Sequence, residues 1–225
     1  MALSTPTQLT SGGNSGTVSS NTTASISPTG GALLIACCGI LRNSAIPSMS
    51  ISDTLTGTGS WTQYTLATSD NKARASIFVA KAGATPGSGT ITFSYTGSNP
   101  SRQAWQVIEI TGQDTTTPVI QNTSGQTSGT SITVTLGSAL TAGNLSFGFI
   151  NAGDTASVTV GSGETEIAEA TSGGSPQARV QCQYGSTNAH DWANLGTYTS
   201  TPALLIEIAQ AVVAPTNNGN FFRMF

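Results

Sequence analysis

Short apolar segments separated by clusters of turn residues constrain the fold of this chain more than any other feature. Within these segments apolar residues alternate or run together, and Gly, Ser, Thr, Asn and Pro lie between them. No segment repeats apolar residues with a helical period over four turns, whereas regular short strands with turn signals between them are typical of a sandwich. The sequence therefore predicts an all-β fold, with strands at residues 22–27, 32–41, 49–54, 62–67, 73–81, 90–95, 104–111, 131–136, 144–151, 156–160, 165–170, 178–184, 196–199 and 203–213.

The composition agrees with strands and excludes one class of partner. Charged residues make up 8% of the 225 positions, hydrophobic residues make up 37%, and the formal net charge is −3. The apolar content is sufficient for a core, so the low charge does not indicate disorder, which usually couples low hydrophobicity to high net charge. With 7 Lys and Arg residues, the chain has too few cations for the basic patch of a nucleic-acid binder.

The second half of the sequence repeats the first half in order. TGGALLIACCGI corresponds to TAGNLSFGFINA, GSWTQYTLA to GETEIAEA, ARASIFVAKAG to ARVQCQYGST, GTITFSY to LGTYTST and QVIEITG to LLIEIAQ. In the last pair Glu109 recurs 98 positions later as Glu207. This recurrence predicts a structural role, such as pairing with Arg74 and Arg179 across the sheet. A period of about 100 residues suits duplication of a sandwich-sized unit.

We therefore expect two related antiparallel β-sandwich units, jelly-roll-like or immunoglobulin-like, from an internal duplication. The first unit covers residues 1–113 and the second covers residues 114–213, and an extended C-terminal tail follows at 214–225. The alternative is one continuous sandwich in which both halves contribute interleaved strands to a single core.

The arrangement resembles a duplicated β-sandwich module found in tailed-bacteriophage structural proteins and in bacterial surface proteins. The resemblance covers about residues 17–213 and is a pattern of core positions without a catalytic motif. The second copy lacks a Trp at the position of Trp61. The resemblance implies a virion structural protein, of the capsid decoration, fibre or tail accessory type. The matching segments are Gly31-Ala32-Leu33-Leu34, Trp61-Thr62, Arg74 to Gly83, Thr90-Ile91-Thr92-Phe93 and Trp105 to Gly112.

Motifs that would carry catalysis or bind a cofactor are missing from the sequence. There is no Gly-x-Ser-x-Gly nucleophile elbow, no phosphate-binding loop and no EF-hand spacing. His190 precedes Asp191 in a turn-rich segment, where we expect a loop histidine rather than a catalytic base. Glu164 and Glu166 would share one strand face about 7 Å apart, within the range of glycosidase pairs, but a solvated strand edge is the favoured interpretation. We expect no enzyme activity, no catalytic residue and no cofactor.

The cysteines indicate a reduced protein without a metal site. Cys37 and Cys38 are adjacent and would point to opposite faces of a strand, and Cys182 leaves an odd number. No Cys-x-x-Cys occurs, and His190 has no partner at ligand spacing. The apolar run at 31–41 is about half of the roughly 20 residues that a membrane helix needs, so it predicts a buried strand and no membrane partner. No secretory signal is visible at the start, so we expect folding in the host cytoplasm and a final location in the virion.

Aromatic residues are concentrated in the strands of the first half. Core packing is the favoured interpretation, because the rings lie among alternating apolar positions. A carbohydrate-binding platform, the alternative, would expose Trp61 or Tyr64 beside a groove. The residues concerned are Trp61, Tyr64, Phe78, Phe93, Tyr95 and Trp105.

The end of the sequence is unusual. A polar spacer follows Pro215, and an aromatic segment then follows at a place where chains usually fray in polar sequence. Each buried apolar side chain gains roughly 1.5–3 kcal/mol, so the segment should dock, either on its own sandwich or, as we prefer, on a neighbouring subunit. The expected partner-binding residues are Phe221, Phe222, Arg223, Met224 and Phe225.

These features together predict a non-enzymatic virion structural protein. A capsid decoration, cement or head-fibre protein is the first choice, bound to other virion proteins and oligomeric in the particle. The alternatives are a phage tail or collar component, and a carbohydrate-binding or host-adhesion module.

Overall fold

A computed structural model describes residues 2–43, 45–153, 157–196 and 200–212. Within these ranges the chain forms strands and no helix, which confirms the all-β prediction. The strands of the first half are β1 (Thr7–Asn14), β2 (Ser20–Thr22), β3 (Leu33–Leu41), β4 (Ser48–Asp53), β5 (Thr62–Ala67), β6 (Ala73–Lys81), β7 (Ile91–Thr96) and β8 (Arg102–Ile110). Those of the second half are β9 (Val119–Thr127), β10 (Ser131–Thr135), β11 (Leu145–Gly153), β12 (Thr159–Val160), β13 (Glu164–Thr171), β14 (Ala178–Gly185), β15 (Ala189–Ala193) and β16 (Thr201–Ile208).

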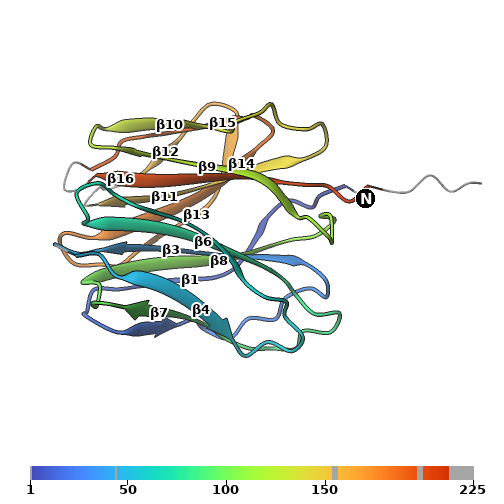
Figure 1. Cartoon of the computed structure of the whole chain (residues 1–225), viewed down its shortest axis with the longest axis horizontal. Helices are drawn as coiled ribbons and strands as arrows, with labels where there is room; N and C mark the ends of the chain where they lie inside the picture. Colours follow the sequence, from blue (N-terminus) through green and yellow to red (C-terminus); the bar gives the residue numbers. More distant parts are fainter. Residues whose placement is uncertain (1, 44, 154–156, 197–199, 213–225) are drawn as a thin grey trace, which may run out of the picture.

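The strands form four stacked antiparallel sheets. The first half supplies a five-stranded sheet in the order β1-β8-β3-β6-β5 and a three-stranded sheet in the order β2-β7-β4. The second half supplies β9-β16-β11-β14-β13 and β10-β15-β12. Figure 1 shows the two five-stranded sheets in the middle of the stack and the three-stranded sheets outside them, with β10 and β15 at the top and β7 and β4 at the bottom.

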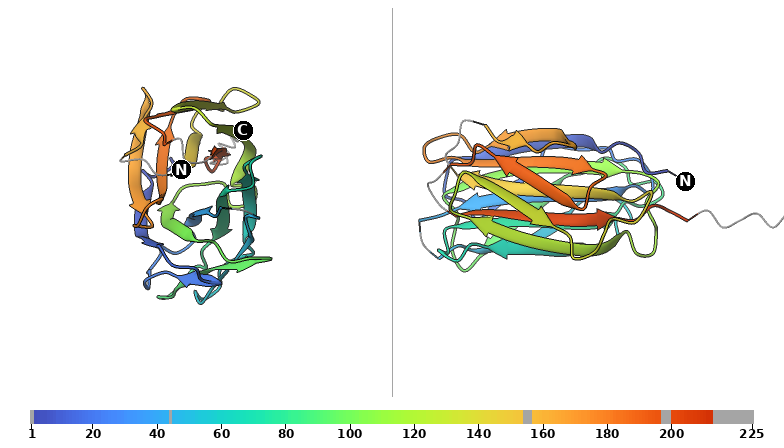
Figure 2. Two further views of the ribbon diagram at one scale, coloured as in Figure 1. Left: turned by 90° about the vertical axis from the view of Figure 1, so that its left-hand side faces the viewer. Right: turned by 90° about the horizontal axis from the view of Figure 1, so that it is seen from above.

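The two halves have the same strand order. Adding eight to each strand number of the first half reproduces both sheets of the second. The contacts between the halves are reciprocal as well, since β8 packs on β13 and β14 while β16 packs on β5 and β6. Reciprocal contacts of this kind are those of a two-fold dimer. Figure 2 shows the strands of both halves running along the long axis of the molecule.

Three hydrophobic cores separate the four layers. Each half has an outer core between its own two sheets, and a central core between the five-stranded sheets contains residues of both halves. The strand Leu33–Leu41 is buried along its whole length. Because side chains alternate along a strand, Leu33 faces the central core and Leu34 faces the outer core. The prediction of a buried strand in the apolar run is thus confirmed.

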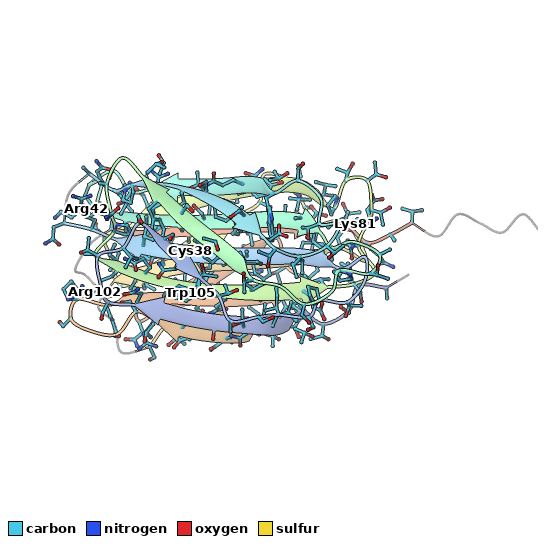
Figure 3. The ribbon with its side chains drawn as sticks, turned by 90° about the horizontal axis from the view of Figure 1, so that it is seen from below. Cys38, Arg42, Lys81, Arg102 and Trp105 are labelled. Carbon is cyan, nitrogen blue, oxygen red and sulfur yellow. The ribbon has the colours of Figure 1, made fainter. Side chains whose placement is uncertain are left out.

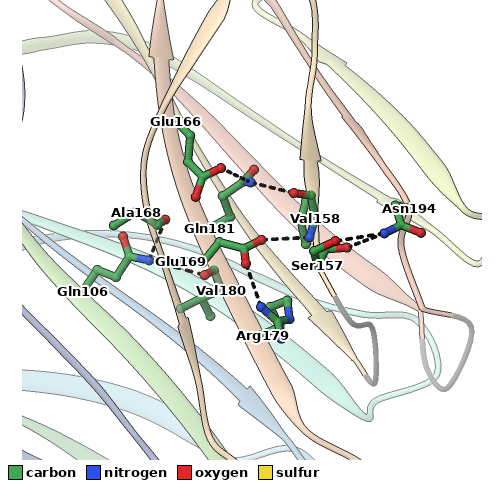
Figure 4. Close-up of polar contacts among 10 residues, drawn as sticks. All are labelled: Gln106, Ser157, Val158, Glu166, Ala168, Glu169, Arg179, Val180, Gln181 and Asn194. Atoms are coloured by element: carbon green, nitrogen blue, oxygen red, sulfur yellow. Dashed lines mark hydrogen bonds and ion pairs between the residues drawn. The ribbon is translucent and has the colours of Figure 1, made fainter.

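Two buried amides join the halves across the central core. Gln106 Nε2 of β8 donates to the carbonyl oxygens of Ala168 (2.9 Å) and Val180 (3.3 Å) in the second half (Figure 4). Asn151 Nδ2 of β11 donates at 3.0 Å to the carbonyl oxygen of Ile40, and at 3.0 Å to that of Arg74, in the first half. A buried amide is costly without its partners, so these bonds favour one register of the two sheets.

A glycine makes room for one of these amides. A Cβ atom at Gly39 would lie 2.6 Å from Cγ of Asn151, closer than real Cβ contacts allow. The backbone of β3 therefore approaches Asn151 closely enough for its hydrogen bonds only because residue 39 has no side chain.

The strand prediction misses three strands and gives wrong bounds for others. It misses β1 and β9, because both are edge strands rich in Gly, Ser, Thr and polar residues with no strong apolar alternation. It also misses β15, where the polar residues His190 and Asp191 interrupt the run of apolar residues that would predict a strand. The predicted strand at 22–27 is wrong beyond Thr22, where β2 ends, and the described part of the predicted strand at 203–213 is wrong beyond Ile208, where β16 ends. Of the predicted strand at 196–199, residues 197–199 lie outside the described residues.

Four of the five predicted parallels between the halves match strands with equivalent positions in the sheets. They are the parallels that involve β3, β5, β6 and β8. The fifth is wrong, because the strand in the position of β7 is β15 and not the segment after it. The change from residue 113 to 114 falls between β8 and β9, but the halves share the central core. The division into domains at this point therefore stays a prediction.

Candidate functional site

One end of the sandwich, which we call the terminal end, brings together both ends of the described chain. β8 and β16 end there, and β3 and β11 begin there, because each pair is antiparallel. Ser4 and Thr111 exchange hydrogen bonds of 2.9 Å, which places the first residues at this end. Ala211 N donates to Gly112 O at 2.9 Å, which places the last described residues beside them. The N-terminus is marked at this end in Figures 1 and 2.

A carboxylate of each half holds a loop at the terminal end. Glu109 accepts hydrogen bonds from N (2.8 Å) and Oγ1 (3.0 Å) of Thr29, just before β3. Glu207 accepts from N of Thr141 (2.9 Å) and Nδ2 of Asn144 (2.6 Å), just before β11, and also from Gln121. Thr29 and Thr141 begin the matched segments TGGALLIACCGI and TAGNLSFGFINA. The repeated glutamates thus have the same structural role, since each holds the loop before a central strand of its own half.

These contacts correct one prediction and explain a pKa. The expected pairing of the glutamates with arginines is wrong, because Arg179 forms an ion pair with Glu169 at 2.6 Å and Arg74 donates to Thr65 at 3.5 Å. Burial by itself raises the pKa of Glu207, but the hydrogen bonds from Gln121, Asn144 and Thr141 outweigh it, and the pKa lies below its ordinary value. The carboxylate is therefore held in its charged form.

A hydrogen-bonded belt joins the two carboxylate clusters. Gln113 and Gln210 form a β-bridge between the halves. Gln113 Nε2 donates to Gly31 O at 2.8 Å, next to the loop that Glu109 holds. Gln210 N donates to Asn144 Oδ1 at 2.9 Å, next to the loop that Glu207 holds. Sequence reasoning misses this belt, because no motif marks Gln113 or Gln210.

Described residues line two pockets at the terminal end. The larger has a volume of about 420 Å³ and is lined by residues of the loop before β3, the segment after β8 and Ala211. The Gln113 side chain in its wall is 4% exposed, and its Oε1 is buried without a hydrogen-bond partner. The smaller, of about 240 Å³, lies beside Glu207 and is lined by Ile120 among others. Among the described residues, Ile120 and Val212 are the large apolar side chains that are exposed, at 46% and 87%.

His190 is buried in β15, so the prediction of a loop histidine is wrong. Its Nε2 lies 2.8 Å from Oγ of Ser146, which donates to Gly185 O at 3.0 Å. The neutral ring then donates through Nε2, and Nδ1 is left buried without a partner. Burial lowers the pKa of His190 to about 4, although Asp191 opposes this. The Ser146 and His190 side chains are fully buried, so a substrate has no access to this pair.

The predicted acidic pair lies on β13 among hydrogen-bonding partners. Glu164 accepts from Thr187 at 3.2 Å, and Glu166 accepts from Nε2 of Gln181 at 3.3 Å, as Figure 4 shows for Glu166. Burial raises the pKa of both carboxyl groups, with Asp191 and Glu169 adding to the effect. Over the described residues, no group of His, Cys, Asp and Glu could hold a metal ion.

Four of the six aromatic rings are buried in a core as predicted, and the other two, those of Trp61 and Tyr64, are half-buried and pack on a core. Phe78, Phe93, Tyr95 and Trp105 belong to the outer core of the first half; the other two rings are half-buried. Trp61 packs on that same outer core and donates to Asp53 at 2.7 Å, whereas Tyr64 packs on the central core. Because these two rings contact different cores, they do not form one flat platform.

Cys37, Cys38 and Cys182 are free and buried. Cys37 in β3 contacts Cys182 of the opposite sheet, and burial raises the pKa of the Cys37 thiol well above its ordinary range. Burial likewise raises the pKa of Cys38 to about 12, although Tyr95 opposes this. Thiols with such pKa values react slowly, since the thiolate is the nucleophile and the metal ligand.

Three of the basic side chains lie toward the ends of the molecule. Figure 3 shows Arg42 and Arg102 toward one end and Lys81 toward the other, with Cys38 and Trp105 between them. None of the described residues belongs to a helix with the length and hydrophobicity needed to cross a membrane. The predicted partner-binding residues Phe221, Phe222, Arg223, Met224 and Phe225 lie outside the described residues.

Comparison with known proteins finds no matching family model, no matching curated protein and no matching solved structure.

Proposed function

We propose that the chain is a non-enzymatic structural protein of a virion, and that it binds neighbouring subunits through its C-terminal tail. The main support for this proposal is the exposure of apolar side chains at the terminal end. The exposed Val212 and Ile120 both lie at this end of the sandwich, where Glu109 and Glu207 hold the loops that contain Thr29 and Thr141. Exposed apolar side chains gathered at one place mark interaction surfaces.

Capsid decoration, cement or head fibre is the specific role that we propose. A protein bound in many copies needs a rigid body and a small anchoring element. The four-layer sandwich supplies the first, and the segment that contains Phe221, Phe222 and Phe225 supplies the second. Other virion proteins are then the partners, with further copies of this chain as neighbours in the particle.

We also propose that the two halves arose by duplication of one β-sandwich unit. The offset of eight strands in both sheets supports this origin, and so does the use of Glu109 and Glu207 on matched threonines. Random similarity between Ser- and Thr-rich strands would not place the same carboxylate on the same loop twice. The ancestral unit would have paired with a second copy through its five-stranded sheet.

A tail or collar component is the second candidate, since a terminal anchor serves either location. A carbohydrate-binding or adhesion module has less support. Trp61 and Tyr64 pack on different cores, and stacking of a sugar ring uses aromatic faces that lie together on the surface.

Immunogold electron microscopy of particles from producing cells tests the proposal. Antibodies raised against the sandwich should label the capsid surface in a regular arrangement. Labelling confined to the tail or collar would replace the first choice by the second. Particles without label, with the protein recovered only outside them, would contradict a virion role.

A further inference from the structure

We propose that strand β9 is a docking edge for a second copy of this chain, whose own β9 pairs with it in the antiparallel direction across a two-fold axis. The pairing joins two five-stranded sheets into one continuous sheet. This inference goes beyond the proposed function and does not rest on it, because it concerns how two sandwiches associate and not how the tail binds a particle.

β9 has a hydrogen-bonded neighbour on one side only. It stands at the end of the sheet order β9-β16-β11-β14-β13, and in the described part of the chain no strand pairs with its other side. Its register with β16 is regular from Gln121 to Thr127. The strand therefore presents a row of unpaired backbone N–H and C=O groups, which is a template for a further strand.

The opposite edge of the same sheet is protected against such pairing, whereas β9 is not. β13 carries Glu164, Glu166 and Glu169, and charged side chains on an edge strand discourage pairing with another chain. β9 extends over nine residues, Val119–Thr127, without a charged residue or a proline. A long edge strand without this protection is the kind that a partner strand covers.

The other five-stranded sheet has an unprotected edge at the same side of the molecule. β5 packs near β9 and also has neither charge nor proline, whereas β1, the remaining edge, lies beside the glutamates of β13. A two-fold axis perpendicular to the sheets pairs β9 with its copy and brings the two β5 strands to the same interface. Because one rotation uses both unprotected edges, a second copy is the partner that fits this side.

The side chains of β9 are compatible with a copy of the same strand. Asn122, Ser124 and Gln126 are exposed and neutral, so antiparallel pairing brings no charges together. In a pair centred on Thr123, Asn122 lies opposite Ser124 of the second copy, and cross-strand pairs of this kind stabilise a sheet. The exposed Ile120 lies on the same strand, and the interface shields it from water.

Sedimentation velocity of the full-length chain at micromolar concentrations tests the proposal. Ser124→Lys places a charge on the exposed side of β9, so pairing brings two like charges together. Thr165→Lys is the matched control, since Thr165 is exposed on β13, the opposite edge of the same sheet. We expect the unmodified chain and Thr165→Lys to dimerise equally, and Ser124→Lys to dimerise at least about tenfold more weakly. Asn122→Lys, at the neighbouring exposed position, should behave like Ser124→Lys.

Three outcomes would overturn the proposal. The first is an unmodified chain that stays monomeric, and the second is a dimer that Ser124→Lys and Asn122→Lys leave intact, because its interface would lie elsewhere. The third is a dimer that is lost when the chain ends at residue 212, since the tail would then make the contact. The shortened chain should still dimerise. No particle is present in these measurements, so their failure is distinct from a failure of the anchoring function.

Discussion

The outer cores of the two halves lie between sheets of identical strand order, yet they are filled differently. In the first half four aromatic rings, those of Phe78, Phe93, Tyr95 and Trp105, pack with aliphatic side chains. In the described part of the second half the outer core has Trp192 as its ring, and the buried Ser146 and His190 lie beside it. Ser146 occupies the position of Leu34 when Thr29 and Thr141 are aligned.

This difference shows which parts of the fold depend on topology and which depend on composition. The carboxylate that holds the loop before the central strand occurs in both halves, whereas the outer core tolerates a polar pair. The hydrogen bonds from His190 to Ser146 and from Ser146 to Gly185 O satisfy part of this pair, whereas Nδ1 of His190 stays buried without a partner. We therefore expect the outer core of the second half to be the more easily disrupted of the two.

The largest effect should come from removing the ring that dominates each outer core. We expect Trp192→Ala to lower the free energy of unfolding by about 4–5 kcal/mol and Phe93→Ala by about 3 kcal/mol. The rings of Phe78 and Trp105 lie 6.2 and 6.5 Å from that of Phe93 and can move into the space. The ring beside Trp192, 5.9 Å away, is the imidazole of His190, which its hydrogen bond to Ser146 holds in place. Urea unfolding of both variants measures the difference. Equal losses would contradict the comparison.

The second effect is a pH dependence that belongs to the second half. His190 is the only histidine, and its pKa falls from 6.5 to about 4 on folding, with burial as the cause. Between these values the unfolded chain binds a proton that the native chain does not, so stability falls as the pH falls. From pH 7 to pH 5 the loss should be about 2 kcal/mol.

His190→Gln is the control for this pH dependence, because glutamine does not titrate. Urea unfolding at pH 7 and pH 5 should show the loss in the unmodified chain and not in the variant. The same loss in both proteins would assign it to carboxyl groups instead.

The third prediction concerns the carboxylates that the halves share. Glu207 is fully buried and binds Thr141, Asn144 and Gln121, whereas Glu109 is half-buried and binds Thr29 alone. We expect Glu207→Gln to cost about 1.5–3 kcal/mol and Glu109→Gln about 1 kcal/mol. Thermal melting of the two variants side by side checks the order. A larger loss for Glu109→Gln would mean that the two clusters do not play matched roles.

Sequence patterns predict the central strands well because these strands are buried on both faces. The continuous apolar run of β3 predicts a strand, and the matched segments predict β6 and β8 as strands. Edge strands such as β1 and β9 have one hydrogen-bonded neighbour and few buried residues, so tertiary pairing and not local pattern makes them strands.

The terminal end is harder to predict from sequence. The recurrence of Glu109 and Glu207 predicts a structural role, but their partners Thr29 and Thr141 follow from loop geometry that no pattern encodes. Gln113 and Gln210 come together only because the linker between the halves runs beside the end of β16. The sequence predicts a loop at His190 because polar residues on a short strand resemble a turn.

The most direct test of the account is whether the tail is what binds the chain to a particle. Particles stripped of the protein are mixed with the full chain or with a chain that ends at residue 212, and the bound fraction is measured by co-sedimentation. We expect the full chain to co-sediment and the shortened chain to lose at least about 100-fold in affinity, since truncation of buried aromatic anchors commonly costs several kcal/mol. Equal binding of the two chains would contradict the anchoring function.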